Sequence, residues 1–474
     1  MAIPSAAKNG GGTATLYGGP TKRFFVSMLT RDIDLDDAIL DLIDNSVDGA
    51  MRSQKKGGTV KTPYTGFKAQ LKISRGTFIL EDNCGGIPDN RIDAAFRLGR
   101  PETQLDSDIP TIGMYGIGMK RAIFKMGREA TVESSSLDGF RRIAYTKAWM
   151  DDESTDTDQQ WDLPISKSGP RPKKGVKVSV DSLRPEASKS FTNESFVEDL
   201  KTKISRHFGY VILKGFAIEV NGATVPPDTL RLFTSNSGKS GINPFDYSTY
   251  LKGVTIRVTV GFHRPLPRLE EIENEQEAPR TREDSGISVV CNDRVILHND
   301  TTFRTGWGTR TVPKFHNQFM AISGVMSFLS NDASALPVST TKTGIEMESE
   351  VYDHAVDVCS SAIKIFTAFT NRWKGRVADT SKFFRDAKKV DAVVDVNLAQ
   401  SKVGKRNSKT GAIQYKPVLP APPADGEERR ISFSRKRSEI EIVSQYLFNE
   451  VRTPSDVGEE CFEQTLAHAK RAQL

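Results

Sequence analysis

The stretch DLDDAILDLIDNSVDGA, residues 34–50, is the segment on which the fold of this chain depends. Apolar residues recur at the spacing of one helix face: Leu35, Ala38, Ile39, Leu42 and Ile43. Polar residues occupy the opposite face: Asp37, Asp41, Asn45 and Asp48. Carboxylates three or four residues apart on a helix repel one another. The pattern therefore predicts an amphipathic helix whose acidic face is either solvated or set against a cation.

The composition is that of an ordinary globular protein. The 474 residues include 66 Lys and Arg against 60 Asp and Glu, with 37% hydrophobic residues. There is no apolar run of about 18 residues, so no transmembrane helix is predicted. Residues 1–19 lack the regions of a secretory signal, and we expect a flexible N-terminus. Scattered cysteines without a CxxC pair argue against zinc or a disulfide framework and favour a cytoplasmic protein: Cys84, Cys291, Cys359 and Cys461.

Residues 20–188 read as an α+β layered domain. Besides the helix at 34–50, short helices are expected at 89–98 and 113–127, the second opened by glycines. Strands are expected at 67–74, 76–82, 129–136, 140–150 and 176–180, with a short strand or turn at 24–29. Residues 99–112 hold two prolines and no period, which predicts a mobile loop.

Residues 189–346 are expected to form a second α/β domain. A helix is predicted at 194–213, and Asn221-Gly222 marks a hairpin within 216–225. Further strands are predicted at 254–263, 286–297 and 319–330, followed by an ordered loop at 336–345. We expect a helical, basic segment at 347–410 and then, over 411–474, a proline-rich linker with short terminal helices.

Three segments carry candidate chemistry: Asp41–Ser46, Glu81–Ile87 and Gly113–Lys120. The oxygen of Asn45 suits Mg²⁺ that bridges phosphates. Asp82, on a Gly-rich turn, can accept a hydrogen bond from the exocyclic amine of adenine. The glycines that open the third segment let backbone N–H groups approach a phosphate, and Lys120 can add a positive charge. This third segment lacks both the P-loop spacing and the third glycine of a dinucleotide fingerprint.

In order, spacing and content, the three segments resemble the GHKL ATPases: gyrase B subunits, MutL repair proteins, heat-shock dimeric chaperones, sensor histidine kinases and MORC proteins. The resemblance implies a Bergerat-type α/β sandwich that binds ATP and Mg²⁺. Asn45 matches the Mg²⁺-binding asparagine, and Asp82 matches the adenine-binding aspartate. The glycine beside that aspartate and the lid glycines match Gly86, Gly113, Gly116 and Gly118. Their neighbours expected at the nucleotide are Ile87, Tyr115, Ile117, Met119 and Lys120.

Two residues depart from the pattern of that family. Asp41 stands where the gyrase, MutL and MORC branches usually place a glutamate, the general base for the attacking water. Aspartate has the same chemistry with a shorter reach, so we expect slow hydrolysis, or a contribution from Asp37 or Asp44. Cys84 replaces the usual first glycine of DxGxG, and we expect Gly85 and Gly86 to preserve the turn.

A further resemblance lies beyond the first domain. GISVVCNDRVI (286–296) and LPVSTTKTG (336–344) are similar to the S5-type transducer domain of MORC and MutL proteins. In that family a lysine on the transducer loop reaches the terminal phosphate, and Lys342 occupies the matching place. MORC-type proteins are the nearest match, over roughly residues 20–345, although their CW or PHD-type reader modules are absent. The resemblance implies a homodimer that closes on ATP and reopens after hydrolysis.

The expected function is an ATP-gated clamp that acts on DNA or on a partner complex, such as an operon partner. Residues 371–410 are rich in Lys and Arg with only four Asp and no Glu, a pattern typical of a solvated face and also compatible with contact to the phosphate backbone of a nucleic acid. A prokaryotic MORC-like role in DNA processing or phage defence is suggested by association alone. The alternatives are a chaperone-like ATPase with protein clients and a pseudo-ATPase nucleotide switch. A histidine kinase is disfavoured, because no histidine precedes residue 20.

Overall fold

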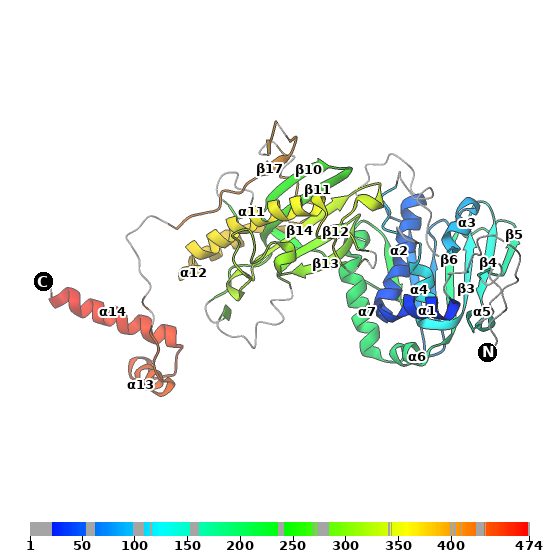
Figure 1. Ribbon diagram of the computed structural model, residues 1–474. Helices are drawn as coiled ribbons and strands as arrows, with labels where there is room; N and C mark the ends of the chain where they lie inside the picture. The colour runs from blue at the N-terminus through cyan, green and yellow to red at the C-terminus, as the bar shows by residue number, and fades with distance from the viewer. Residues whose placement is uncertain are drawn as a thin grey trace, which may run out of the picture. The chain divides into compact units, whose positions relative to one another are not determined.

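The computed structural model describes residues 21–53, 62–97, 109–113, 116–151, 161–235, 241–268, 271–272, 284–339, 342, 344–398, 401, 404–408, 410–422, 431 and 433–472. The chain divides into two compact units, Met1–Ala421 and Pro422–Leu474. Figure 1 shows the larger unit as two sheets, each with helices packed against it. Both sheets belong to this larger unit, and the candidate site lies where they meet.

The first sheet is almost entirely antiparallel. Its described strands run in the order β5 (Ile165–Ser168), β4 (Phe140–Tyr145), β3 (Gly127–Ser135), β6 (Gly175–Leu183), β2 (Phe78–Asp82), β1 (Lys68–Ile73), β7 (Ala217–Val220) and β8 (Ala223–Thr224). The exception is the parallel pair of β1 and β7. Asn221 and Gly222, both with positive φ, make the β7–β8 turn, as the Asn-Gly pair predicts.

Helices cover one face of this sheet (Figure 1): α1 (Lys22–Arg31), α2 (Leu35–Ser53) and α4 (Gly118–Met126), with α3 (Asp89–Phe96), α5 (Lys147–Asp151), α6 (Pro185–Phe191), α7 (Glu194–His207) and α8 (Gly209–Leu213) around them. The apolar stripe of α2 packs into the core beneath α4 and β1. Residues 24–29 are helical, not a strand, because the Thr21 hydroxyl accepts from the Phe24 backbone N–H and caps α1.

The second sheet is crossed by a single long helix. Its described strands run in the order β13 (Arg294–Asp300), β12 (Gly286–Cys291), β14 (Ile322–Leu329), β11 (Val254–Phe262), β10 (Phe245–Leu251), β17 (Ile413–Tyr415) and β16 (Lys405–Arg406). Helix α11 (Glu350–Arg372) packs on β11 and β14 and buries Tyr352, Phe366 and Phe369 in their core. The remaining elements are β9 (Arg231–Ser235) paired with β15 (Ala387–Asp391), α12 (Val377–Arg385), and short 3₁₀ turns at Phe303–Thr305, Asn317–Phe319 and Ala333–Ala335.

Several boundaries differ from those expected. The first domain does not end at 188, because β7 and β8 complete its sheet. The expected strand 140–150 turns into α5 after Tyr145. Residues 286–297 form a hairpin and not one strand, since Asn292 and Asp293 both adopt the positive φ that a tight turn requires. The segment 347–410 is not only helical, because β15 and β16 pair with strands of the second domain region.

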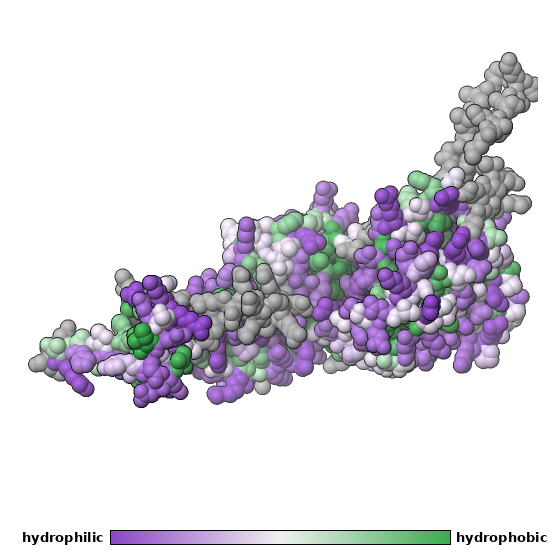
Figure 2. Space-filling view, turned by 90° about the horizontal axis from the view of Figure 1, so that it is seen from below, coloured by the Kyte–Doolittle hydropathy of each residue, from purple (hydrophilic) through white to green (hydrophobic). Residues whose placement is uncertain are grey.

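The C-terminal unit contains α13 (Arg437–Phe448) and α14 (Pro454–Ala472). Among its described apolar residues only Val457 is fully buried. Large apolar side chains are exposed instead: Ile431, Phe433, Ile442, Tyr446, Val451 and Phe462. Figure 2 shows apolar surface, in green, among hydrophilic side chains on this unit. Two helices with so little buried apolar area have a weak core.

The β12–β13 turn connects the two sheets. Asn292 Nδ2 donates to the carbonyls of Thr111 and Ser330, at 3.0 and 2.9 Å. Asp293 accepts from the Tyr64 hydroxyl and from Lys214 Nζ, at 3.1 and 2.6 Å. Arg294, which is next in sequence, donates from Nε to Asp44 Oδ1 of α2 at 2.9 Å, with both side chains almost fully buried. Three consecutive residues therefore fix the second sheet to the first domain.

We expect Arg294→Met to lower the free energy of unfolding by about 3 kcal/mol, because it removes a cation from the buried Asp44 carboxylate. Urea unfolding of the intact chain measures the change. Arg142→Met is the matched control, since Arg142 is exposed and lies 3.9 Å from Glu133, so its loss should cost less than about 1 kcal/mol. Equal losses in the two variants would contradict the role given to the buried contact.

Candidate functional site

A cavity of about 330 Å³ lies where α2, the turn after β2, α3, the start of α4 and Lys342 meet. Its volume is at the lower end of the range of small-molecule sites. The three segments singled out from the sequence all reach it, together with a residue from the loop after β14. The predicted residues among its lining are Asp41, Asn45, Asp82, Gly86, Ile87, Gly113, Gly116, Ile117, Gly118, Met119 and Lys342. Tyr115 lies outside the described residues.

Asp82 ends β2 with its carboxylate held by three donors. Oδ1 accepts from the backbone N–H groups of Cys84 and Val176, at 2.9 and 3.1 Å, and Oδ2 accepts from the Ser46 hydroxyl at 2.8 Å. Burial raises the pKa of Asp82, and these three hydrogen bonds only partly oppose the shift. Since each carboxylate oxygen can accept about two hydrogen bonds, Oδ2 keeps a place for one more donor, such as an exocyclic amine.

The turn after Asp82 has room for glycine alone at two positions. Gly85 and Gly86 have φ of +92° and +76°, and a Cβ on Gly86 would lie 2.2 Å from the Ser135 carbonyl oxygen. Cys84 is buried and is not among the residues with positive φ, so the turn does not need a glycine there. Gly49 of α2 packs against Cys84, since a Cβ there would meet the Cys84 Cβ at 3.1 Å. Burial raises the pKa of Cys84, which keeps it a packing thiol.

The glycines of the third segment press directly on the acidic face of α2. Asp48 accepts from the backbone N–H groups of Ile112 and Gly113, at 2.9 Å each. A Cβ on Gly113 would lie 2.6 Å from Asp48 Oδ2, and one on Gly118 would lie 3.2 Å from Asp41 Cγ. Burial raises the pKa of Asp48, against the charge of Arg52 and Lys342. A side chain at either position would therefore have to displace a carboxylate of α2.

Helix α4 begins beside the cavity without a side-chain cap. Ile117 occupies the N-cap position and accepts only through its backbone carbonyl, from Arg121 N. The first N–H groups of such a helix lack intrahelical partners and, together with the helix dipole, favour an anion. This end of the cavity therefore suits phosphate oxygens.

Of the two cations in the first turn of α4, only Arg121 lines this cavity. Its Nη2 donates to Asp41 Oδ2, while its Nε is buried with no hydrogen-bond partner in the described part of the chain. Lys120, the residue predicted here, lies elsewhere: its Nζ donates to the carbonyls of Ala95 and Arg97 at 2.7 Å each, where α3 ends. The sequence offered both cations, but it did not show which of them faces the cavity.

Lys342 reaches the acidic face of α2 from 298 positions along the chain. Its Nζ lies 3.0 Å from Asp44 Oδ2 and 3.6 Å from Asp41 Oδ1. Burial disfavours the charged lysine, but the carboxylates of Asp44, Asp41 and Asp48 outweigh it and raise the pKa of Lys342. Likewise burial raises the pKa of Asp44, but Lys342 and Arg294 outweigh it, so the net shift is downward. The two groups therefore remain an ion pair through neutral pH.

Asn45 is the one exposed residue between Asp41 and Met51 on α2, and it lines the cavity. The Asn45 amide makes no hydrogen bond within the described part of the chain. A carboxamide oxygen is a ligand type that Mg²⁺ accepts, usually with phosphate oxygens and water completing its shell. Asn45 is thus suited to hold Mg²⁺ on the solvent side of the cavity.

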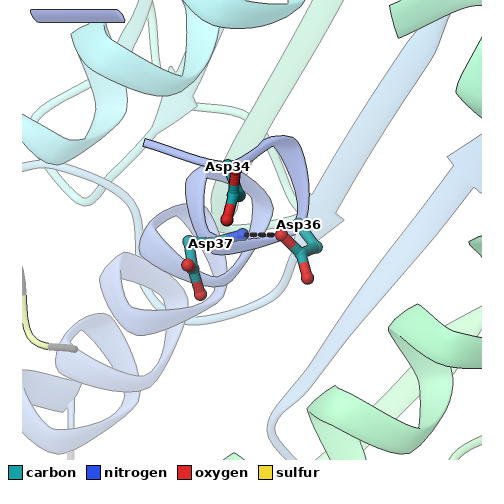
Figure 3. Close-up of side chains that lie close together, drawn as sticks. All are labelled: Asp34, Asp36 and Asp37. Atoms are coloured by element: carbon teal, nitrogen blue, oxygen red, sulfur yellow. Dashed lines mark hydrogen bonds between the residues drawn. The ribbon is translucent and has the colours of Figure 1, made fainter. Parts of the chain in front are cut away.

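A second acidic cluster lies at the start of α2 and is not part of this cavity. Figure 3 shows Asp34, Asp36 and Asp37 with their carboxylates close together, and the Asp37 N–H donates to Asp36. Lys203 Nζ of α7 lies 2.7 Å from both Asp36 and Asp37. One ammonium group therefore offsets part of the cluster's negative charge. Asp37, suggested above as an auxiliary base, does not line the cavity.

Comparison with known proteins gives a match over most of the first domain. Residues 33–186 match the family model described as histidine kinase-, DNA gyrase B- and HSP90-like ATPase, which covers less than half of the chain. The match supports a GHKL-type ATPase domain here, which confirms the resemblance at the level of the superfamily. No curated protein matches the chain. In the part of the chain that the structure describes, no helix has the length and apolarity to cross a membrane.

We expect Gly86→Ala to destabilise the chain by about 2 kcal/mol or more, because its φ of +76° and the Ser135 carbonyl leave no space for a Cβ. Thermal unfolding followed by circular dichroism measures the change. Gly76→Ala provides the control, since Gly76 lies in the preceding β1–β2 connection with open space at its Cβ position. A Gly86 variant as stable as the Gly76 variant would show that the turn tolerates a side chain.

Proposed function

We propose that the chain is a Mg²⁺-dependent ATPase whose nucleotide binds in the 330 Å³ cavity. One observation carries the proposal: Lys342 of the second domain meets Asp41 and Asp44 at a cavity that also contains Asp82 and the glycine segment. The carboxylate on the turn suits the amine of adenine, and the glycine-lined start of the helix suits the phosphates. The lysine from the second domain suits the charge that develops on the terminal phosphate. The family match supports the ATPase class.

In this assignment the adenine lies against Asp82, Gly86 and Ile87, with the Asp82 Oδ2 accepting from the exocyclic amine. The phosphates lie at the start of α4, between Gly113, Gly116 and Gly118. Arg121 lines this part of the cavity, and its guanidinium would give a phosphate oxygen a charged donor once it turned from Asp41. Asn45 holds Mg²⁺, which when bound neutralises phosphate charge and orients the terminal phosphate.

Asp41 is the proposed general base and Lys342 the group that stabilises charge on the terminal phosphate. In the structure the Asp41 carboxylate is already paired with Arg121, and Lys342 Nζ is 3.6 Å away. The Arg121 hydrogen bond occupies Asp41 Oδ2, so Arg121 would have to turn from Asp41 to a phosphate before this oxygen can accept a proton from water. This requirement, with the short reach of aspartate, supports slow turnover and keeps a pseudo-ATPase nucleotide switch as the second candidate.

The wider proposal is an ATP-gated homodimer of the MORC-like type, with an S5-type transducer as second domain, in the cytoplasm. Arg294 and Lys342 both contact Asp44 of α2, and these contacts support the proposal. Through them, a change at α2 on nucleotide binding would reach both the second sheet and the loop that holds Lys342. Exposed basic side chains support DNA as the partner: Lys382, Arg385, Lys388, Lys389 and Lys405. A chaperone-like ATPase with protein clients is the alternative to DNA, and an operon partner is a third kind of client.

We expect the Asn45→Ala and Asp82→Asn variants not to bind nucleotide. Calorimetry with a non-hydrolysable ATP analogue in the presence of Mg²⁺ measures the binding. Asp82→Asn places an N–H₂ donor where acceptors are needed. Because burial raises the pKa of Asp82, affinity should fall on acidification at a pH above 3.8, the ordinary value, as the acceptor is protonated. Unchanged affinity in both variants would place the nucleotide elsewhere. Asn243→Ala, in the second domain region, is the control that should bind normally.

Turnover should separate from binding in two variants. Lys342→Ala should keep nucleotide affinity within about threefold and lower kcat by about 10²-fold or more. Asp41→Asn should abolish hydrolysis and hold a closed dimer, measured by light scattering with ATP. Each turnover assay is run alone, with DNA and with an unfolded protein. Stimulation of hydrolysis by DNA favours the clamp, whereas stimulation by the unfolded protein favours the chaperone. Full turnover in Asp41→Asn would remove it as the base, and no turnover in the unmodified chain would leave the nucleotide switch.

A further inference from the structure

The two oxygens of the Asp82 carboxylate have different sets of donors. Oδ1 accepts from the backbone N–H groups of Cys84 and Val176, at 2.9 and 3.1 Å, so both of its lone pairs are taken. Oδ2 accepts a single hydrogen bond, from the Ser46 hydroxyl at 2.8 Å. In the part of the chain that the structure describes, Ser46 is the only side chain that hydrogen-bonds Asp82. Oδ2 is therefore the oxygen with a free acceptor position for a ligand.

Ser46 is held in place for this contact by the helix that carries it. Its neighbours Ile43 and Val47 are fully buried in the core, and Ser46 itself is 1% exposed and lines the cavity. A serine inside a helix commonly donates to the carbonyl four residues before it. The Ser46 hydroxyl donates instead to Asp82, across from α2 to the end of β2. The position of this hydroxyl is therefore fixed relative to the carboxylate.

The direction of the Ser46 hydrogen bond decides what Oδ2 offers a ligand. Because Oδ1 faces two N–H donors, a proton taken up by Asp82 would have to sit on Oδ2. Oδ2 would then donate a hydrogen bond where it now accepts one. Burial favours that protonation by raising the pKa of Asp82, whereas the Ser46 hydrogen bond lowers the pKa. Ser46 thus favours the form in which Oδ2 is an acceptor.

Other elements also bring charged or titratable groups to this cavity: Asp41, Asp48 and Arg52 of α2, Cys84 of the turn, Arg91 of α3, Arg121 of α4, and Lys342. Strand β6 lines it with Val176 and Val178, which carry no charge. The charge of Arg52 also lowers the pKa of Asp82, but the Ser46 hydrogen bond has the larger effect. Burial raises the pKa of Cys84, so this neighbour stays a neutral thiol. Among the side chains, Ser46 therefore contributes most to keeping Asp82 ionised.

We propose that Ser46 is a positioning residue that keeps Oδ2 of Asp82 an acceptor, and that it thereby makes the cavity select a 6-aminopurine over a 6-oxopurine. The inference rests on the proposed function, in which the base lies against Asp82. An amine at this position of the base donates to Oδ2, whereas an oxo group would bring two acceptor oxygens together. Without Ser46, a protonated Oδ2 would donate to the oxo group, and the selection would weaken.

ADP and IDP form a matched pair of probes, because IDP has an oxo group in place of the amine. By calorimetry with Mg²⁺, the unmodified chain should bind ADP about tenfold or more tightly than IDP, and Ser46→Ala should reduce this preference to about threefold or less. The pH at which half of the ADP affinity is lost should rise by about one unit in Ser46→Ala, because removing the hydrogen bond raises the pKa of Asp82. A merely structural role for Ser46 would weaken both probes equally and leave this pH unchanged.

Ser205→Ala is the matched control, since Ser205 is a buried serine of α7 whose hydroxyl donates to the Pro226 carbonyl at 2.6 Å, outside the cavity lining. It should change neither the preference nor the pH midpoint. Alanine is the best helix former, so we expect Ser46→Ala to fold. The unmodified chain gives a test that needs no variant, because acidification should lower its preference for ADP as Oδ2 becomes protonated.

Two outcomes would overturn the inference while the proposed function stands. In one, ADP binds and Ser46→Ala keeps the full preference and the same pH midpoint. In the other, acidification weakens ADP binding to the unmodified chain without changing its preference over IDP. If the unmodified chain bound neither probe, the proposed function itself would fail, and the inference with it.

Discussion

Five charged side chains, four of them buried and Lys342 nearly so, meet where the two sheets join: Arg121, Asp41, Lys342, Asp44 and Arg294. Removing ions from water is costly, and mutual attraction offsets that cost only when the geometry is good on every side. Here α2 supplies both anions, whereas the cations come from α4, β13 and the loop that holds Lys342. The arrangement therefore exists only when the first domain, the second sheet and that loop are all in place. Among the residues that line the cavity, four cations, Arg52, Arg91, Arg121 and Lys342, stand against three carboxylates, Asp41, Asp48 and Asp82, which leaves a small positive excess for phosphate.

One helix sets the rest of the site. Asp41, Asp44, Asn45 and Asp48 each have another member of the set three or four residues away, so they form one face of α2, and the apolar stripe behind them is buried. Each polar residue meets a different element: Arg121 of α4, Lys342, the open cavity, and the backbone of the glycine segment. The repulsion expected along this face is relieved by three different neighbours. An acidic stripe that alone could have been a solvated surface is thus the point where the elements of the larger unit converge.

The sequence predicts the parts of this site that depend on local pattern. Helical spacing located α2, and the Gly-rich turn after Asp82 and the glycine segment before α4 followed from the backbone freedom that they need. Contacts between distant segments carry no such local signal. Whether Lys120 or Arg121 faces the cavity depends on the exact start of α4, and Arg294 was hidden inside an expected continuous strand. The extent of the first domain was missed for the same reason, because β7 joins β1 only through tertiary pairing.

That pairing of β1 with β7 has a consequence for how the chain is made. Gln70 of β1 and Glu219 of β7 are hydrogen-bonded at 2.6 Å although 149 residues separate them. A ribosome adds roughly 5–20 residues per second, so on the order of ten to thirty seconds pass between the two strands leaving it. During that time β1 pairs with β2 on one side and presents an open edge on the other, a ready template for another chain. Lys68 and Lys72 lie on that strand, and their charge makes the waiting edge a poor partner for a neighbouring nascent chain.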